Sequence, residues 1–176
     1  MGKLVVILCE DNQAACLLRR FLRKGGQRFP REKIAPSGQG SGEQFVRRMY
    51  PSELEFCRRN RSKLIVCTDA DALSLQERTQ SLENACQREG IPPRAGQDQA
   101  ALFIPKRNIE TWLKFLTGNS EVDEDEDYSP HGSHRADKRI CQAAAVEFYK
   151  YCRGQKPRPV SLPSLESACN EARRVI

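Results

Sequence analysis

Two aspartates separated by one residue follow a short apolar run. Residues 63–67 read Lys-Leu-Ile-Val-Cys, and Asp69 and Asp71 come shortly after them. A run of this length is typical of a strand buried on both faces. Residues two apart on an extended chain point the same way, so these carboxylates would repel each other unless a proton or cation intervenes. We therefore expect a divalent metal ion here.

Polar residues also follow two other apolar runs, at 4–8 and 101–104, which are further strand candidates. These polar residues are Glu10, Asp11, Lys106, Arg107 and Glu110. If the strands are parallel neighbours, their ends meet at one edge of the sheet, where open α/β sheets bind ligands. Carboxylates beside two bases suit Mg²⁺ next to a phosphate, since Mg²⁺ prefers oxygen ligands and can activate water for phosphodiester cleavage. Lys106 or Arg107 would offset charge on that phosphate.

Helical patterns separate the strand candidates. The expected strands are 3–9, 33–35, 63–68 and 101–104. The first expected helix has Asn12 as its N-cap. Further helices are expected over residues 45–50, 51–57, 74–88, 108–117, 137–152 and 165–172. This alternation is typical of an α/β fold with a mostly parallel sheet and helices on both faces. Trp112 lies on the apolar stripe of its helix, so we expect it in the core.

The chain divides into three segments. Residues 1–118 hold every strand candidate and form the predicted core domain. Residues 119–136 contain the acidic run 121–127, and such runs are usually solvated and mobile. Residues 137–176 form a helical extension that we expect to pack on the core.

Composition bounds the class of protein. The chain has 176 residues and a formal net charge of +6, with a sequence pI of about 9.0, which favours nucleic acid as a partner. Its eight cysteines include no C-x-x-C pair, so we expect reduced thiols and no disulfide framework. We find no signal-peptide pattern and no long apolar span, and we expect a cytoplasmic protein that does not enter a membrane.

Glu10 at the end of a first strand, with residues 69–71 (Asp-Ala-Asp) at the end of a later one, resembles the TOPRIM domain. That domain occurs in topoisomerases, bacterial primases, small ribonucleases and nucleases of the overcoming-lysogenization-defect type. Residues 108–113 (Asn-Ile-Glu-Thr-Trp-Leu) are similar to small stand-alone TOPRIM-like proteins of bacterial genomes and phage-defence operons. The resemblance covers residues 3–117.

This resemblance implies a Rossmann-like fold and a metal-dependent nuclease. It implies Mg²⁺ or Mn²⁺ bound by Asp69 and Asp71, with Glu10 as an acid/base or further ligand. It also places Glu110 at the site, and it implies cleavage of DNA or RNA by the effector subunit of a defence-type system. One departure is Asp11, which stands where the family usually has glycine, so the turn after Glu10 differs from the family pattern.

Residues 7–12 (Ile-Leu-Cys-Glu-Asp-Asn) also resemble the start of a response-regulator receiver domain. In receivers an acidic pair binds Mg²⁺, a strand-end aspartate (here Asp69) accepts phosphate, and a lysine beside proline (here Lys106) completes the site. Three features favour the nuclease instead. The order is Pro-Lys where receivers have Lys-Pro, a receiver gives Asp71 no role, and the basic charge suits nucleic acid.

A third hypothesis is a non-catalytic subunit of an ATPase–nuclease complex. The chain contains no G-x-x-x-x-G-K-[ST] motif. Proteins of the type that it resembles often act beside a separate ATPase subunit. The acidic run 121–127 would then cover a basic groove or dock on that partner.

Several residues have a plainer alternative. Asp11 and Glu110 would each stabilise a helix N-terminus simply as first-turn charges. His131 and His134 have a spacing that could bind zinc, but no cysteine or second histidine pair accompanies them, which favours a surface loop.

Basic residues outside the strand ends are candidates for nucleic-acid contacts. With Arg107, we predict that Lys138 and Arg139 at the start of a late helix contact the substrate. The basic stretches 19–24 and 58–63 fit phosphate contacts and solvated helix faces equally well.

Overall fold

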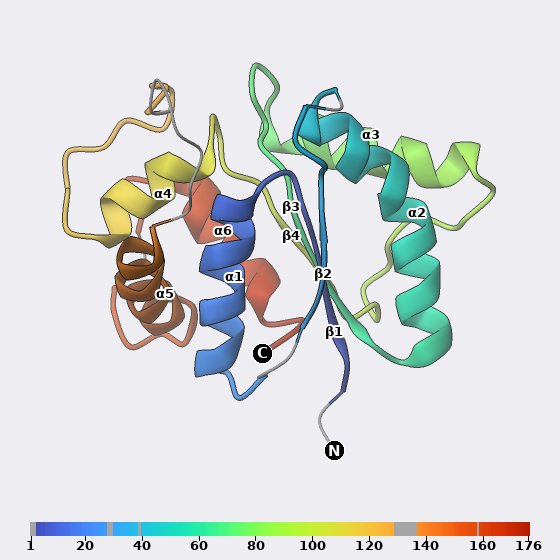
Figure 1. Cartoon of the computed structure of the whole chain (residues 1–176), viewed down its shortest axis with the longest axis horizontal. Helices are drawn as coiled ribbons and strands as arrows, with labels where there is room; N and C mark the ends of the chain where they lie inside the picture. The colour runs from blue at the N-terminus through green and yellow to red at the C-terminus, as the bar shows by residue number, and fades with distance from the viewer. Residues whose placement is uncertain (1–2, 28–29, 39, 129–136, 158) are drawn as a thin grey trace.

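Four strands form one parallel sheet in the order β2-β1-β3-β4. The computed structural model describes residues 3–27, 30–38, 40–128, 137–157 and 159–176. The strands are β1 (Val5–Cys9), β2 (Arg31–Ile34), β3 (Lys63–Cys67) and β4 (Ala100–Phe103). Their carboxyl ends all lie at the top of Figure 1. The predicted parallel sheet and α/β fold are confirmed, and the architecture is Rossmann-like.

Six helices cover the two faces of this sheet in the described part of the chain (Figure 1). They are α1 (Asn12–Lys24), α2 (Gly42–Asn60), α3 (Leu75–Arg88), α4 (Ile109–Leu116), α5 (Lys138–Cys152) and α6 (Pro163–Ala172). Helices α2 and α3 pack on one face, and α1, α4, α5 and α6 on the other. Across the described residues, none of the helices combines the length and apolar character needed to span a membrane.

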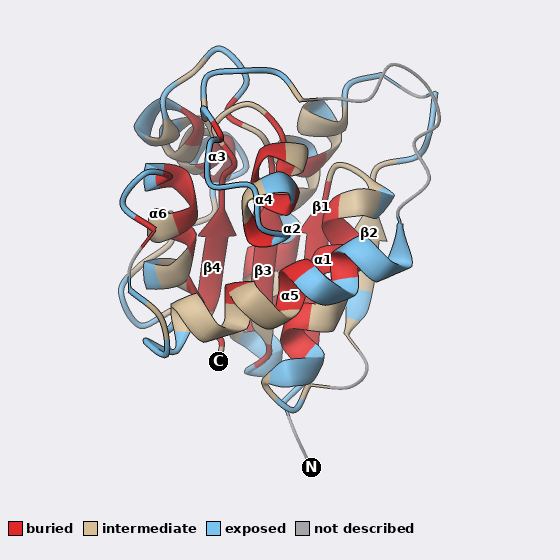
Figure 2. Ribbon diagram, turned by 90° about the vertical axis from the view of Figure 1, so that its left-hand side faces the viewer, coloured by how far each residue is buried: buried red, intermediate tan, exposed pale blue. Residues whose placement is uncertain are grey.

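Alternating side chains of the buried strands pack on opposite faces of the sheet. Val5, Ile7 and Cys9 of β1 join the cluster under α1, whereas Val6 and Leu8 join the cluster under α2. This is the period of two expected of a pleated strand. Figure 2 shows β1, β3 and β4 buried. The uninterrupted apolar runs of the sequence therefore mark strands that are covered on both sides.

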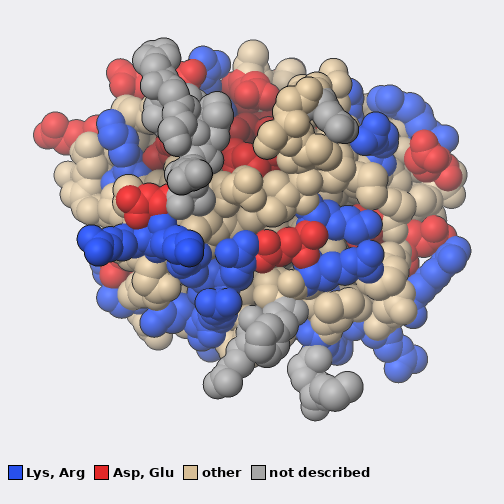
Figure 3. Space-filling model, in the orientation of Figure 1, with Lys and Arg blue, Asp and Glu red and all other residues tan. Residues whose placement is uncertain are grey.

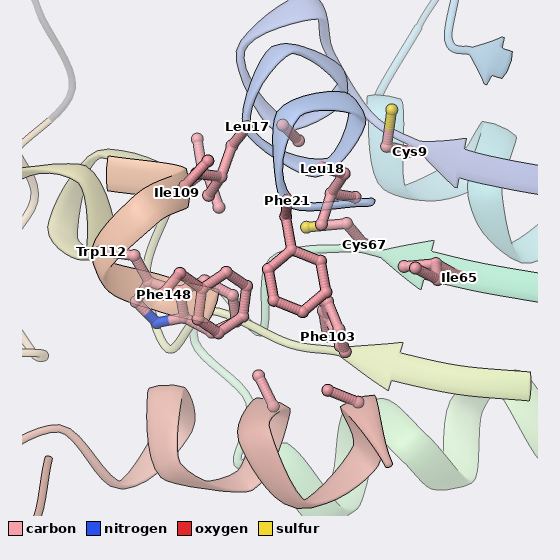
Figure 4. Close-up of a cluster of buried hydrophobic side chains, with 14 of the residues drawn as sticks. Cys9, Leu17, Leu18, Phe21, Ile65, Cys67, Phe103, Ile109, Trp112 and Phe148 are labelled. Carbon is pink, nitrogen blue, oxygen red and sulfur yellow. The ribbon is translucent and has the colours of Figure 1, made fainter. Parts of the chain in front are cut away.

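Aromatic rings fill the larger of the two clusters (Figure 4). The ring of Phe21 lies 4.6 Å from that of Phe148 and 6.0 Å from that of Phe103, centroid to centroid. Trp112 is fully buried and donates its indole N–H to Ser164 Oγ at 2.8 Å. The prediction that Trp112 belongs to the core is confirmed.

The C-terminal helices pack on the rest of the chain. Helix α5 lies against α1, and α6 lies beside β4, where Glu171 Oε2 accepts a hydrogen bond from the Leu102 N–H at 2.9 Å. In the acidic run, Glu124 accepts from the backbone N–H and the hydroxyl of Ser164 at the start of α6. The expectation that the whole run is solvated is therefore wrong at Glu124, because the N–H groups of a helix start need acceptors.

Two helix predictions were wrong in detail. The N-cap of α1 is Asp11, whose carboxylate accepts from the Ala14 N–H at 2.8 Å, and Asn12 is the first helical residue. The two helices expected at 45–50 and 51–57 are a single helix, α2, with Pro51 inside it. Proline usually interrupts a helix, but both halves of α2 bury apolar side chains against the same sheet face, which outweighs the lost hydrogen bond.

The expectation of reduced thiols was wrong for one pair of cysteines. Cys152 at the end of α5 forms a disulfide with Cys169 of α6, with their Cα atoms 4.4 Å apart. No sequence spacing marks this pair, because packing of the two helices brings it together. The other six cysteines are free and buried.

Candidate functional site

The ends of β1 and β3 lie side by side at the point where the sheet order reverses. The chain passes from β1 to β2 on one side and then returns across β1 to β3 and β4. Cys9 of β1 pairs with Cys67 of β3, so the residues that follow these strands emerge at the same level. Ligands of open α/β sheets bind at such a reversal, outside the carboxyl ends of the strands.

Glu10 bridges the two strand ends. Its carboxylate accepts hydrogen bonds from the Thr68 hydroxyl and from the Asp69 backbone N–H, the latter at 2.9 Å. Burial raises the pKa of Glu10 from 4.5 to about 7, although these two hydrogen bonds act in the opposite direction. The charges of Asp71 and Asp11 also raise it. Two hydrogen bonds thus hold the Glu10 carboxylate in place, but burial and the neighbouring acids disfavour its negative charge.

Asp69 is the centre of the acidic cluster. Its pKa is raised well above the usual range, first by burial and then by the charge of Glu10. Smaller contributions in the same direction come from Asp11, Asp71 and Glu110. The structure therefore brings the other four predicted acids within electrostatic reach of Asp69, although the five come from three separate parts of the sequence. Figure 3 shows acidic side chains gathered at the top, where the strands end.

Asp71 occupies a different environment from Asp69. Strand β3 ends at Cys67, and Asp71 has a left-handed backbone conformation with a φ of 55°. The premise that both aspartates continue an extended strand is therefore wrong, and aspartate is among the few residues that tolerate this conformation. The exposed Asp71 carboxylate pairs with the Arg78 guanidinium at 3.2 Å.

Arg78 and Gly42 are two residues near the site that the sequence analysis missed. Arg78 is buried and also pairs with Glu43 at 2.7 Å, so it joins the start of α2 to the loop after β3. A Cβ atom on Gly42 would lie 2.8 Å from the Cβ of Glu10, which shows how closely α2 begins against that residue. No sequence pattern identifies either residue, because both act through packing between distant segments.

The basic candidates lie in two places. Lys106 donates to the Leu73 carbonyl oxygen at 3.1 Å, so its amine lies against the loop that carries Asp69 and Asp71. Arg107 is half-buried and follows it in the turn before α4. Lys138 and Arg139 are exposed on the first turn of α5, and within the described residues neither bonds to an acid of the cluster.

The donor chemistry of the cluster fits a divalent cation, because buried carboxylates with raised pKa values are stabilised by a nearby positive charge. As the side chains stand, however, the described residues include no group of three or more His, Cys, Asp or Glu side chains placed to hold a metal. The Asp71 carboxylate pairs with Arg78 instead. His131 and His134, the zinc alternative, lie outside the described residues.

No protein-family model, curated protein or solved structure matches the chain. The resemblances to TOPRIM and receiver domains stay predictions from the sequence motifs. What can be argued about function rests on the geometry of the strand ends.

Proposed function

We propose that this chain is a nuclease that uses Mg²⁺ or Mn²⁺ to cleave phosphodiester bonds of DNA or RNA. The observation that carries the proposal is the contact between Glu10 and the Asp69 backbone at the adjacent ends of β1 and β3. Both carboxyl groups have raised pKa values there, and each is influenced by the charge of the other acids. A cation is the simplest partner for such a group of acids.

Glu10 and Asp69 would hold the ion, with Asp71 as a third ligand and Glu110 as an auxiliary one. A bound divalent ion would supply an activated water and stabilise the leaving oxygen. Lys106 would contact the phosphate and offset its charge, as its place beside the aspartate loop allows.

The receiver-like alternative has one observation in its favour. The strand order β2-β1-β3-β4 is that of the first four strands of flavodoxin-like sheets, which include receivers, and Asp69 follows β3. Incubation with acetyl phosphate would label Asp69 in a receiver and leave a nuclease unlabelled. A separate ATPase partner and a role in phage defence follow from the sequence resemblance alone.

The test is cleavage of supercoiled plasmid, single-stranded DNA and RNA by the purified chain with Mg²⁺, Mn²⁺ or a chelator. We expect metal-dependent cleavage that falls by about 100-fold or more in Asp69→Asn, corresponding to about 3 kcal/mol of transition-state stabilisation. Glu121→Gln, which neutralises an exposed acid outside the group that acts on Asp69, is the matched control and should keep full activity. Cleavage that survives chelation, or equal rates in both variants, would refute the proposal.

A further inference from the structure

A hollow lined by arginines lies between the first half of α2 and the end of α3. It has a volume of about 230 Å³. Its basic lining residues are Arg47 and Arg48 of α2 and Arg88 of α3, and the one acid that lines it is Glu89. Figure 3 shows Lys and Arg side chains at the upper right, over these two helices, with some acidic side chains among them.

The charges of these arginines are poorly compensated. Arg47 pairs with Glu43 at 3.3 Å and its side chain is still 36% exposed. Arg48 lies over the ring of Phe45, with its guanidinium carbon 6.0 Å from the centroid. In the part of the chain that the structure describes, no carboxylate lies within 4.0 Å of Arg48 or Arg88, whereas Arg19, Arg58 and Arg94 each hold an acid. Uncompensated guanidinium groups in a hollow favour phosphate.

Ion pairs connect this hollow to the acidic cluster. Arg47 and Arg78 share the carboxylate of Glu43, and Arg78 in turn pairs with Asp71. The residue before Glu43 is Gly42, which packs directly on Glu10. This hollow, which we call the arginine groove, thus lies on the helix whose start contacts the strand-end acids. One bound nucleic-acid strand could therefore reach both the groove and the acids.

We propose that the groove between α2 and α3 binds the phosphate backbone of the substrate nucleic acid beside the bond to be cleaved. The inference rests on the proposed function and adds a substrate-binding surface to it. Arg48 and Arg88 contact successive phosphates, and Arg47 exchanges part of its pairing with Glu43 for the backbone. Binding there is electrostatic and independent of base sequence.

The experiment measures binding without cleavage. Fluorescence anisotropy with a labelled single-stranded DNA 20-mer, and with its duplex, is recorded in chelator from 50 to 300 mM salt (about the range in which such contacts titrate). All proteins carry Asp69→Asn. The groove variant adds Arg48→Ala and Arg88→Ala, and a second version uses Gln at both positions. The control adds Arg153→Ala and Arg173→Ala, two exposed arginines at the ends of α5 and α6.

We expect the groove variants to bind at least about tenfold more weakly at low salt, with the slope of log K against log salt reduced by about 2. The control should keep the slope of the Asp69→Asn parent, although it loses the same charge. Equal slopes in groove and control variants, or no binding by the parent, would overturn the inference. A second outcome separates the two proposals. If the wild-type chain shows no cleavage and the groove variants still lose binding, the proposed nuclease function is wrong, and the groove remains a nucleic-acid-binding surface.

Discussion

Acidic side chains at the two ends of the sheet have pKa values shifted in opposite directions. At the amino end, just before β4, Arg58 donates to both carboxylate oxygens of Asp98, at 2.9 and 2.6 Å. That hydrogen-bonded pair lowers the pKa of Asp98. At the carboxyl end, burial and mutual repulsion raise the pKa values of Glu10 and Asp69. The charged form of Asp98 therefore stabilises the fold, whereas the charged forms of Glu10 and Asp69 oppose it.

This contrast separates an acid that is paired with a cation from acids that repel one another within one sheet. Arg58 also donates to the carbonyl oxygens of Pro92 and Pro93, so its guanidinium fastens a loop. Beyond β1 and β3, Glu10 accepts a backbone hydrogen bond and Asp71 pairs with Arg78, but among the described residues no cation is bonded to Asp69. A folded chain retains unfavourable charge of this kind where a ligand uses it.

The largest expected effect is a gain in stability on neutralising Glu10. Its folded pKa of about 7 exceeds the ordinary 4.5, so the carboxyl contributes most stability below pH 4.5 and loses it as the pH rises through 7. Each pKa unit corresponds to about 1.4 kcal/mol, so Glu10→Gln should stabilise the metal-free chain by up to about 3 kcal/mol at pH 8 and by about 1 kcal/mol or less at pH 5. The amide can still accept from Thr68 and Asp69.

Urea unfolding in chelator at pH 5, 6.5 and 8 measures this difference. Glu121→Gln, an exposed acid in a turn-rich segment, should leave the free energy of unfolding unchanged at every pH. A Glu10→Gln variant that is no more stable than the wild type at pH 8 would show that the charge of Glu10 does not destabilise the carboxyl end of the sheet.

The next effect is a loss of stability at the amino end. Arg58→Ala removes four hydrogen bonds and leaves Asp98 without its cation, which should lower the free energy of unfolding by about 2 kcal/mol. Because the folded pKa of Asp98 is lowered, this stability is present above the ordinary pKa of aspartate and is lost as the pH falls through the folded value. The same urea series should show a constant deficit from pH 5 to 8, and a deficit that grows with pH would contradict it.

The smallest effect concerns the contact between α2 and Glu10. Gly42→Ala places a methyl group 2.8 Å from the Glu10 Cβ and should lower stability by about 1 kcal/mol, since overpacking outweighs the better helix propensity of alanine. Gly96→Ala is the control, because a Cβ there meets no atom within 4 Å. Thermal unfolding of both variants decides the matter, and equal melting temperatures would show that Gly42 does not hold Glu10 in place.

The sequence was sufficient to predict the sheet and the edge of the sheet at which the acidic residues lie. Uninterrupted apolar runs identified three buried parallel strands, and the places where they end located Glu10 and Asp69 at one edge. Those features are local, because strand length and apolar pattern are written in neighbouring residues.

Side-chain direction and long-range partners could not be obtained in this way. The conformation of Asp71 and its pairing with Arg78 depend on how α3 packs after a turn. The close start of α2 on Glu10, the continuous helix through Pro51 and the Cys152–Cys169 bond each depend on tertiary packing. No pattern of neighbouring residues reports those contacts.

The most direct measurement is the binding of Mn²⁺ to the purified chain by isothermal titration calorimetry at pH 8, which lies above the pKa of about 7 of Glu10. The charge arrangement predicts saturable binding by the wild type that is lost in Asp69→Asn and retained in Glu121→Gln. A wild-type chain that binds no Mn²⁺, or an Asp69→Asn variant that binds it equally well, would show that these acids do not form a metal site.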